Sequence, residues 1–258
     1  MHLPTPESPP DTPTQRRSDR RRLLRALNTS LAFVLVLVAV FSAQGHFDVS
    51  AWAVQPWSLD GWRGLLAAPL LHGSPAHLAT NAFSLLLLGT LAGVVYPRAT
   101  LRALPLVWLG SGLGAWLLGS AGSHHLGASG LTHGLMFLLL VLGLLRRDRP
   151  AIAAAMIAFM LYGGMLLTIL PREPGISWQA HLGGAVAGVV AAWLFRKLDP
   201  AAPRKRYSWE DEEDGEPLRD ELERSGLEPA SPHDVPVLWQ RPVETRGTVL
   251  PFTPRDRP

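Results

Sequence analysis

The sequence predicts an all-α, polytopic membrane protein built around six transmembrane helices. Long apolar runs are concentrated between residues 23 and 198, whereas charge and proline gather in residues 1–22 and 199–258. Six of these runs reach or approach the ~20 mostly apolar residues that cross the hydrocarbon core of a bilayer. We therefore divide the chain into a basic segment (1–22), a membrane domain (23–198) and an acidic, proline-rich tail (199–258), which we expect to be disordered.

The expected spans follow one another at short intervals after a longer first loop. They cover Leu24–Gln44, His77–Tyr96, Leu101–Ser120, Ala128–Leu145, Ala151–Leu170 and Trp178–Leu198. The first span has a rival interpretation as a signal peptide, because an arginine-rich start precedes its apolar core and small residues end it. In the first loop, Trp52, Trp57 and Trp62 have the spacing expected at a membrane interface.

Arginine and lysine mark one side of the expected membrane domain. They precede the first span, separate the second from the third and the fourth from the fifth, and follow the sixth. The opposite side holds only Arg63 and Arg172. Since cytoplasmic loops carry an excess of arginine and lysine, we expect both termini to be cytoplasmic and the fourth span to begin outside.

The composition excludes several functions. The chain has no cysteine, which excludes disulfides, thiolate metal sites and a cysteine nucleophile. Its formal net charge is only +3 and no basic patch is interleaved with aromatic residues, so we expect no nucleic-acid partner. A transporter with a histidine relay would show inverted repeats and polar interruptions at mid-depth, and the sequence shows neither.

Residues 127–134 read GASGLTHG at the start of the fourth expected span. Ser129 lies between glycines, and His133 follows it by four residues, which places both on one face of a helix. A helix N-terminus carries free N–H groups and a positive dipole end, so this position suits a developing oxyanion. Taken alone, GxSG is a weak motif, because the chain has 24 glycines.

Two other expected helices carry polar residues at a similar depth. On the second, His77 and Asn81 are four residues apart and share a face, and His72 lies in the loop just before them. On the sixth, His181 lies near the outer end. A single intramembrane histidine is more often a packing residue, but ionisable groups are costly in a membrane and here several lie at one face. We therefore infer a functional site that includes Ser129.

Helix packing and metal binding are the alternative explanations for some of these residues. Gly184 and Gly188 have the small-residue spacing of close helix packing, and we assign them to packing rather than to chemistry. Six histidines in one outer half suggest a metal site, but HExxH is absent and no carboxylate lies at ligand spacing, so we expect no metal. We expect His124 and His125 to lie in a solvated loop.

Together these residues resemble the rhomboid family of intramembrane serine proteases. The resemblance covers about residues 61–198 and rests on WR at 62–63, HGSPAHLATN in the second span, SGLGAW in the third, GASG in the fourth and AHLGGAVAG in the sixth. It implies a six-helix rhomboid-like bundle, in a bacterial inner membrane, that cleaves transmembrane or membrane-anchored proteins in the lipid bilayer without a cofactor. A catalytically inactive relative that binds transmembrane clients is the alternative.

Carried over by motif position, the resemblance implies a dyad with Ser129 as the nucleophile and His181 as its general base. The side chains of His77 and Asn81 and the backbone N–H of Ser129 would form the oxyanion hole. The supporting positions are His72, His133, Trp62, Arg63, Gly127 and Gly130. No carboxylate lies in the outer half of any expected span, so we do not expect a third, acidic member.

The sequence departs from the family pattern at two places. Rhomboids often carry a tyrosine four residues after the nucleophile, where this chain has His133. We expect His133 to pack against His181 or hydrogen-bond to it, rather than to shuttle protons. The glutamate that often follows the glycine of the second helix, here Gly89, is also absent, which we expect to affect stability more than chemistry.

Overall fold

The computed structural model describes residues 13–59, 61–171 and 175–199, and most of them are helical. The α-helices of this part are α1 (Pro13–Ala43), α2 (Trp62–Ala67), α3 (Pro75–Val95), α4 (Pro97–Leu118), α5 (Ser129–Arg146), α6 (Arg149–Tyr162), α7 (Met165–Thr168) and α8 (Trp178–Phe195). Within the described residues, β-pairing is limited to one isolated bridge between Val54 and His125. The predicted all-α fold class is confirmed. The start of the basic segment (1–12) and the expected tail from residue 200 lie outside the described residues.

Five of the described helices are long and apolar enough to cross a membrane, namely α1, α3, α4, α5 and α8. The expected fifth span is different, because α6 ends at Tyr162 and α7 begins at Met165. With 14 residues, α6 is about 21 Å long at 1.5 Å per residue, short of the ~30 Å hydrocarbon core. Gly163 and Gly164 separate the two helices: both keep right-handed helical dihedrals, but their carbonyl groups accept from the N–H groups three residues later, at Leu166 and Leu167. The expected single helix is therefore two, and the count of six spans is not confirmed.

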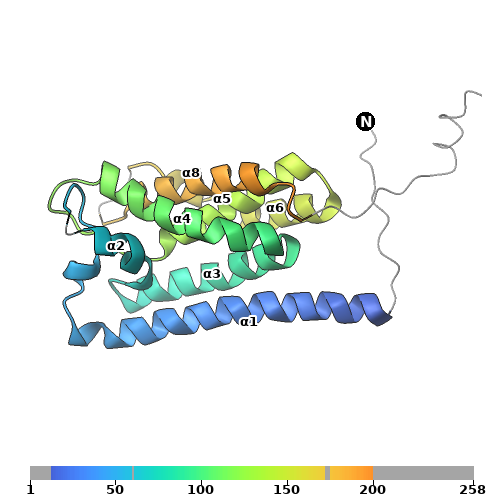
Figure 1. Ribbon diagram of the computed structural model, residues 1–258, viewed down its shortest axis with the longest axis horizontal. Helices are drawn as coiled ribbons and strands as arrows, with labels where there is room; N and C mark the ends of the chain where they lie inside the picture. The colour runs from blue at the N-terminus through green and yellow to red at the C-terminus, as the bar shows by residue number, and fades with distance from the viewer. Residues whose placement is uncertain (1–12, 60, 172–174, 200–258) are drawn as a thin grey trace, which may run out of the picture. The chain divides into compact units, whose positions relative to one another are not determined.

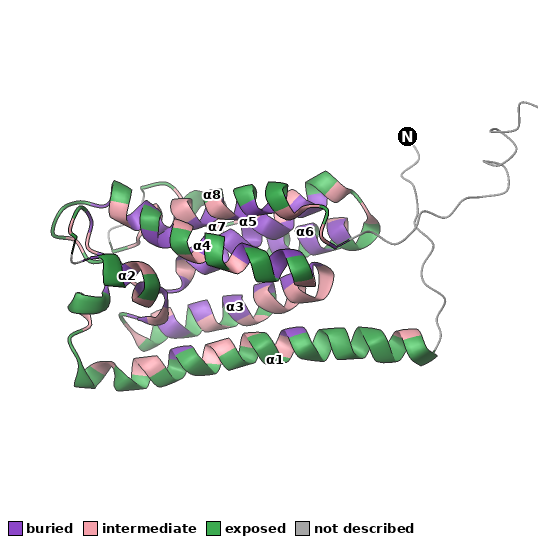
Figure 2. Cartoon of the chain, viewed as in Figure 1, coloured by how far each residue is buried: buried purple, intermediate pink, exposed green. Residues whose placement is uncertain are grey.

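Helix α1 lies along one side of the bundle and packs mainly on α3 (Figure 1). It begins at Pro13 rather than at Leu24, so the arginine-rich stretch belongs to the same helix. Gly89 and Gly93 of α3 face it closely, and a Cβ added at Gly93 would lie 3.0 Å from the Cβ of Ala26. Most of α1 remains exposed (Figure 2), which leaves its other side free to face lipid.

Helix α5 is the most buried of the five candidate spans, and α8 packs against both α5 and α4. Glycines make the contact between α5 and α8 close. A Cβ added at Gly184 would overlap the carbonyl group of Gly130, and a Cβ at Gly188 would overlap that of Gly134. Because the two backbones touch, the N-terminal ends of α5 and α8 lie within side-chain reach of each other.

Indole N–H groups fasten the long loop between α1 and α3 to the end of α4. Trp57 Nε1 donates to the carbonyl oxygen of Gly119 at 3.2 Å, and Trp116 Nε1 donates to that of Ser58 at 3.1 Å. The two indole rings also pack, with their centroids 5.6 Å apart. Of the three tryptophans that the sequence placed at an interface, Trp57 therefore also holds the loop to the helices.

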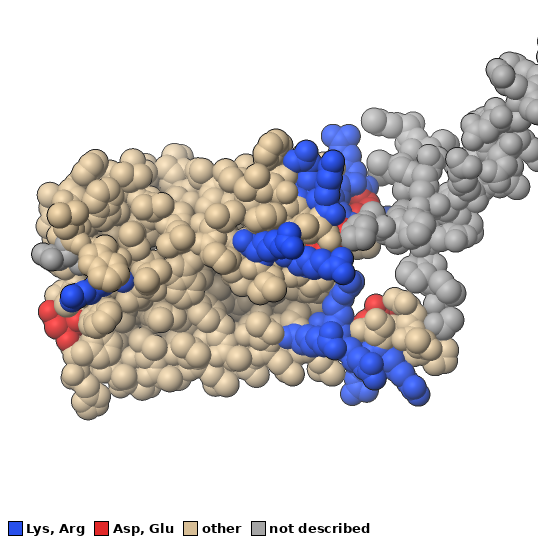
Figure 3. Space-filling view, viewed as in Figure 1, with Lys and Arg blue, Asp and Glu red and all other residues tan. Residues whose placement is uncertain are grey.

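Lysine and arginine gather at one end of the bundle, around the start of α1 (Figure 3). This is the distribution that the positive-inside rule expects when that end faces the cytoplasm. The orientation of the chain in a membrane stays a prediction.

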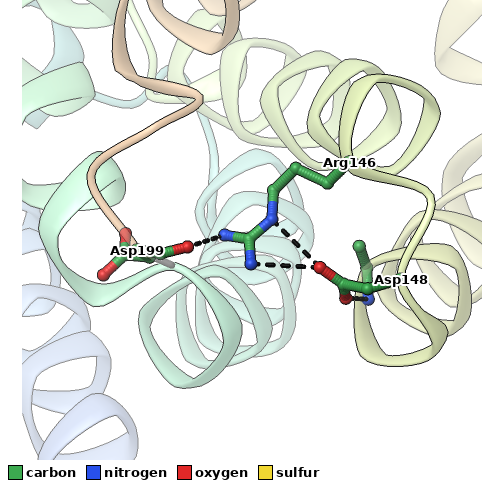
Figure 4. A network of polar contacts seen from close by, with 4 residues as sticks. Arg146, Asp148 and Asp199 are labelled. Atoms are coloured by element: carbon green, nitrogen blue, oxygen red, sulfur yellow. Dashed lines mark hydrogen bonds and ion pairs between the residues drawn. The ribbon is translucent and has the colours of Figure 1, made fainter. Parts of the chain in front are cut away.

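A polar network ties several helix ends together at this basic end (Figure 4). Arg146, at the end of α5, donates from Nη1 to the main-chain oxygen of Asp199, and its Nη2 lies 3.0 Å from Asp148 Oδ2. Asp148 caps α6 by accepting from the N–H of Ala151 at 2.9 Å. The carboxylate of Asp199 accepts from the N–H of Ala99 at 2.9 Å, in the first turn of α4. The network thus fixes the ends of α4, α5, α6 and α8 relative to one another.

Candidate active site

Ser129 is the first residue of α5, and His181 lies in the first turn of α8. The Nε2 atom of His181 lies 2.8 Å from the Oγ atom of Ser129. His181 is only 6% exposed, whereas Ser129 is partly exposed. A hydroxyl and an imidazole at this distance have the arrangement of a nucleophile and its base.

The hydrogen bond at Nδ1 of His181 shows which ring nitrogen carries the proton. Its Nδ1 lies 3.0 Å from the main-chain oxygen of Thr168, the last residue of α7. A carbonyl oxygen only accepts, so Nδ1 carries the proton and Nε2 keeps its lone pair. The Ser129 hydroxyl therefore donates to Nε2. His181 is thus in the tautomer that a general base requires, with its proton on Nδ1. A main-chain carbonyl here orients the imidazole, as a carboxylate does in a Ser-His-Asp triad.

His133 packs flat against His181, with ring centroids 3.9 Å apart and an interplanar angle of 15°. Its Nδ1 lies 2.7 Å from the main-chain oxygen of Ser129, so Nδ1 donates and Nε2 is the acceptor. Nε2 then accepts from the hydroxyl of Thr168 at 2.8 Å. His133 is 3% exposed, and it links the start of α5 to the end of α7.

Two side-chain donors lie beside the backbone that leads into Ser129. The Nδ2 atom of Asn81 is buried and has no partner within the described residues. Gly127 has a φ of +115°, and a Cβ there would lie 2.8 Å from Nε2 of His77 and 3.7 Å from Nδ2 of Asn81. Both the backbone conformation and the space therefore require glycine. In addition, the N–H of Ser129 lies at a helix N-terminus and lacks an intrahelical acceptor.

Gly130 fixes the start of α5 between its neighbours. A Cβ added at Gly130 would overlap the side chain of Ser111 on α4 and lie 2.8 Å from the carbonyl oxygen of Ala180 on α8. Residues of α4, α5 and α8 therefore meet directly behind the Ser129–His181 pair.

The Rhomboid domain family matches residues 59–198, which is more than half of the chain. This chain belongs to the rhomboid family. An uncharacterised protein of Mycobacterium tuberculosis is 38% identical over 204 residues, which cover 75% of this chain and 85% of the relative. An uncharacterised protein of Mycobacterium leprae is 36% identical over 195 residues, or 72% of this chain and 76% of the relative. Rhomboid-like protein 11, chloroplastic, of Arabidopsis thaliana is 26% identical over 219 residues, which cover 75% of this chain and 74% of the relative.

His72 of this rhomboid is buried beside the candidate oxyanion donors. Its ring makes an edge contact with His77, with centroids 5.2 Å apart, and neither ring nitrogen has a partner within the described residues. Burial, followed by the nearby His77, lowers the pKa of His72 to about 4. The side-chain amide of Gln44 holds the backbone of His72, since it donates to the carbonyl oxygen at 2.8 Å and accepts from the N–H at 2.9 Å. The sequence motifs did not indicate Gln44.

His125 corrects one expectation, because only His124 of the pair is exposed. The ring of His125 is buried between two hydroxyls, with Nδ1 2.7 Å from Ser177 Oγ and Nε2 2.9 Å from Ser123 Oγ. Its main chain also pairs with Val54 through two hydrogen bonds of 2.9 Å. Burial and the adjacent His124 lower its pKa. His125 thus connects the first loop to Ser177, which directly precedes α8 and lies four residues before His181.

Trp62 and Arg63 lie at the start of α2, and the structure leaves both side chains exposed. The Arg63 guanidinium lies 6.0 Å from the Trp62 ring centroid. The hydrogen bonds that fasten the first loop come from Trp57 and Trp116 instead. The supporting role that the resemblance implies for Trp62 and Arg63 stays a prediction.

The part of the chain that the structure describes contains no group of three histidine or acidic side chains arranged to hold a metal ion. Its outer histidines instead form the pairs described above, His72 with His77 and His133 with His181.

Proposed function

We propose that this rhomboid protein is an intramembrane serine endopeptidase that uses Ser129 and His181 as a catalytic dyad. The observation that carries the proposal is the 2.8 Å separation of Ser129 Oγ and His181 Nε2. The hydrogen bond from His181 Nδ1 to the carbonyl of Thr168 supports it, because it leaves Nε2 ready to accept a proton.

In the proposed reaction, Ser129 Oγ attacks the scissile carbonyl carbon while its proton moves to His181 Nε2. The resulting imidazolium keeps its Nδ1–H bond to Thr168, and the carbonyl dipole stabilises the positive charge. The C–N bond then breaks, and Nε2 returns the proton to the leaving amine. Water attacks the acyl-enzyme by the same base catalysis and releases the second product. The partial exposure of Ser129 gives substrate and water access to the hydroxyl.

The tetrahedral intermediate carries a negative charge that needs hydrogen-bond donors. Asn81 Nδ2 is buried without a partner in the described residues, so it can donate to this oxyanion without giving up another bond. His77 also lies against Gly127, and the N–H of Ser129, two residues further along at the start of α5, is a third donor. Loss of one such donor typically lowers the rate by about 10²–10³.

The proposed substrates are transmembrane or membrane-anchored proteins cut near the outer face of the membrane, with both termini of the enzyme in the cytoplasm. The support is that Ser129 begins a spanning helix whose other end, at Arg146, lies among the basic residues. A continuous helix keeps its carbonyl groups in internal hydrogen bonds. We therefore expect cleavage where glycine, proline or polar residues weaken the substrate helix, after a small residue.

The test is labelling of the detergent-solubilised protein by a fluorophosphonate probe, together with cleavage of a transmembrane reporter. Ser129→Ala and His181→Ala should each abolish both signals. Ser84→Ala is the matched control, because its hydroxyl donates only within its own helix, to Thr80 O at 2.9 Å, and it should leave both signals intact. Labelling that survives in Ser129→Ala and His181→Ala would refute the dyad. Wild-type protein that binds the reporter but neither reacts nor cleaves would instead favour an inactive client-binding protein.

A further inference from the structure

A cleft of about 1520 Å³ separates α1 from α4, and its lining includes neither Ser129 nor His181. Residues of α3 and α5 also contribute to its walls. Small-molecule sites typically measure about 300–1,000 Å³, so the cleft is large even for a drug-sized ligand. Its lining runs along α1 from Thr14 to Phe33, and this extent and its position on the side of the bundle covered by α1 suit an elongated ligand that enters from the lipid.

The two ends of the cleft differ in chemistry. The end near the start of α1 is basic: five arginines line it (Arg17, Arg21, Arg22, Arg25 and Arg98), with Asp199 beside Arg98. Beyond Thr29 and Ser30 the lining is mostly apolar, and it includes Phe33, Leu85, Leu104, Trp108, Leu131 and Leu135. Phe33 and Trp108 meet edge to face across it, with ring centroids 5.9 Å apart. A ligand that satisfies both ends must combine an anionic group with a long apolar chain.

The arginines on α1 are available to such a group. Within the described residues, none of Arg17, Arg21, Arg22 and Arg25 forms an ion pair with a carboxylate. All four are exposed at the end of the cleft where basic residues gather (Figure 3). The planar guanidinium fork matches the geometry of phosphate oxygens and binds them in pairs.

A second, independent feature lies just inside the basic end. Thr100 lines the cleft and is 7% exposed, yet its hydroxyl has no hydrogen-bond partner within the described residues. One turn further along α4, Pro105 has no N–H, so the carbonyl of Leu101 lacks its usual helical donor. Buried polar groups are normally hydrogen-bonded. The Thr100 hydroxyl, which has no partner within the described residues, is therefore available to a ligand in the cleft.

We propose that this cleft binds an anionic phospholipid from the leaflet that surrounds the start of α1. Its phosphate lies among the α1 arginines, its glycerol ester region accepts from the Thr100 hydroxyl, and one acyl chain runs along Leu104 and Trp108. Basic pockets between transmembrane helices are suited to such headgroups. The site is separate from the Ser129–His181 pair and does not depend on the protease proposal.

The test measures lipid binding to the full-length protein by native mass spectrometry in detergent, with phosphatidylglycerol and phosphatidylcholine as probes. Wild-type protein should prefer phosphatidylglycerol. The double variant Arg21→Gln/Arg25→Gln should lose about 25-fold in affinity for it, at about fivefold per arginine. The charge-matched control Arg20→Gln/Arg149→Gln removes two arginines from the same end of the protein but outside the cleft lining, and it should retain the preference.

A second variant keeps the test decisive if the double variant fails to fold. Thr100→Val removes a hydroxyl that no described residue uses, so it should preserve the thermal unfolding midpoint without lipid. It should weaken phosphatidylglycerol binding about fivefold, the effect of one hydrogen bond.

Four results would overturn the proposal. Equal binding of the two lipids would exclude headgroup selection, and equal losses in the two double variants would indicate general surface charge. Displacement by excess inorganic phosphate would indicate an anion site without a lipid chain. Binding that appears only after the carboxylates between Glu210 and Glu216 are neutralised would assign the cleft to the protein's own acidic segment.

Discussion

Replacement of His133 distinguishes a packing role from a proton-transfer role at the candidate site. His133→Phe keeps a flat ring against His181 but removes both of the hydrogen bonds that His133 makes. Neither former partner loses all its hydrogen bonds. The Ser129 carbonyl still accepts from the Thr132 hydroxyl at 2.7 Å, and the Thr168 hydroxyl can donate to Met165 O at 3.0 Å. We therefore expect a stability loss of only about 1–2 kcal/mol, from two exchanged hydrogen bonds.

His133→Ala is the informative comparison, because it also removes the ring that supports His181. A buried ring deleted to alanine should cost about 3–5 kcal/mol of stability and let the imidazole of His181 move. A displacement of about 1 Å at a catalytic group can lower the rate by about 10². The assay is kcat for cleavage of a transmembrane reporter, together with the thermal unfolding midpoint. If packing is the role, His133→Phe should retain activity within about tenfold while His133→Ala loses about 10². Equal losses in kcat for both variants, with His133→Phe stably folded, would refute the packing role and favour proton transfer.

Three further outcomes follow from the contacts. Gly184→Ala should destabilise the protein by about 3 kcal/mol or more in chemical unfolding, because its Cβ overlaps a backbone carbonyl, whereas Gly164→Ala, in open space, should be neutral. His125→Phe should lower the thermal midpoint through the loss of two buried hydrogen bonds, and exposed His124→Phe should not. The pKa of His72 is about 4 in the folded protein and 6.5 ordinarily, so its contribution to the free energy of unfolding should be fully present above pH 6.5. It should fall by up to about 3 kcal/mol between pH 6.5 and 4, with a shallower pH slope in His72→Gln.

The sequence predicted the helical class and the similar depth of Ser129 and His181 for a physical reason, whereas their pairing as a dyad was implied by the rhomboid resemblance. Ser129 is the first residue of α5 and His181 lies in the first turn of α8, so their depth follows from where the two helices start and not from long-range contacts. Gly184 indicated close packing, but the structure was needed to show that it touches Gly130. A sequence shows which residues share a face of one helix, but it does not show which other helix packs against that face.

The errors arise where tertiary context decides. Residues 151–170 are mostly apolar, so hydropathy alone predicts one span, yet the regular α-helix is interrupted at Gly163 and Gly164. His125 was expected in a solvated loop because its neighbours are polar, but two hydroxyls from separate segments enclose its ring. Gln44 directly follows α1 and belongs to no sequence motif. Only its two hydrogen bonds to the main chain of His72 show that it holds this segment.

The end of α7 at Thr168 and the orientation of His181 by a main-chain carbonyl are two aspects of one arrangement. Within the described residues, both ring nitrogens of His181 have partners other than a carboxylate, and a carboxylate at this depth would be costly to ionise. A main-chain carbonyl carries a dipole but no net charge, so it can fix the imidazole tautomer without that desolvation cost. Inside a regular helix the carbonyl of residue 168 would be bonded to the N–H four residues later. Because α7 ends at Thr168, that oxygen is free to accept from Nδ1, and the helix end itself supplies the orienting group.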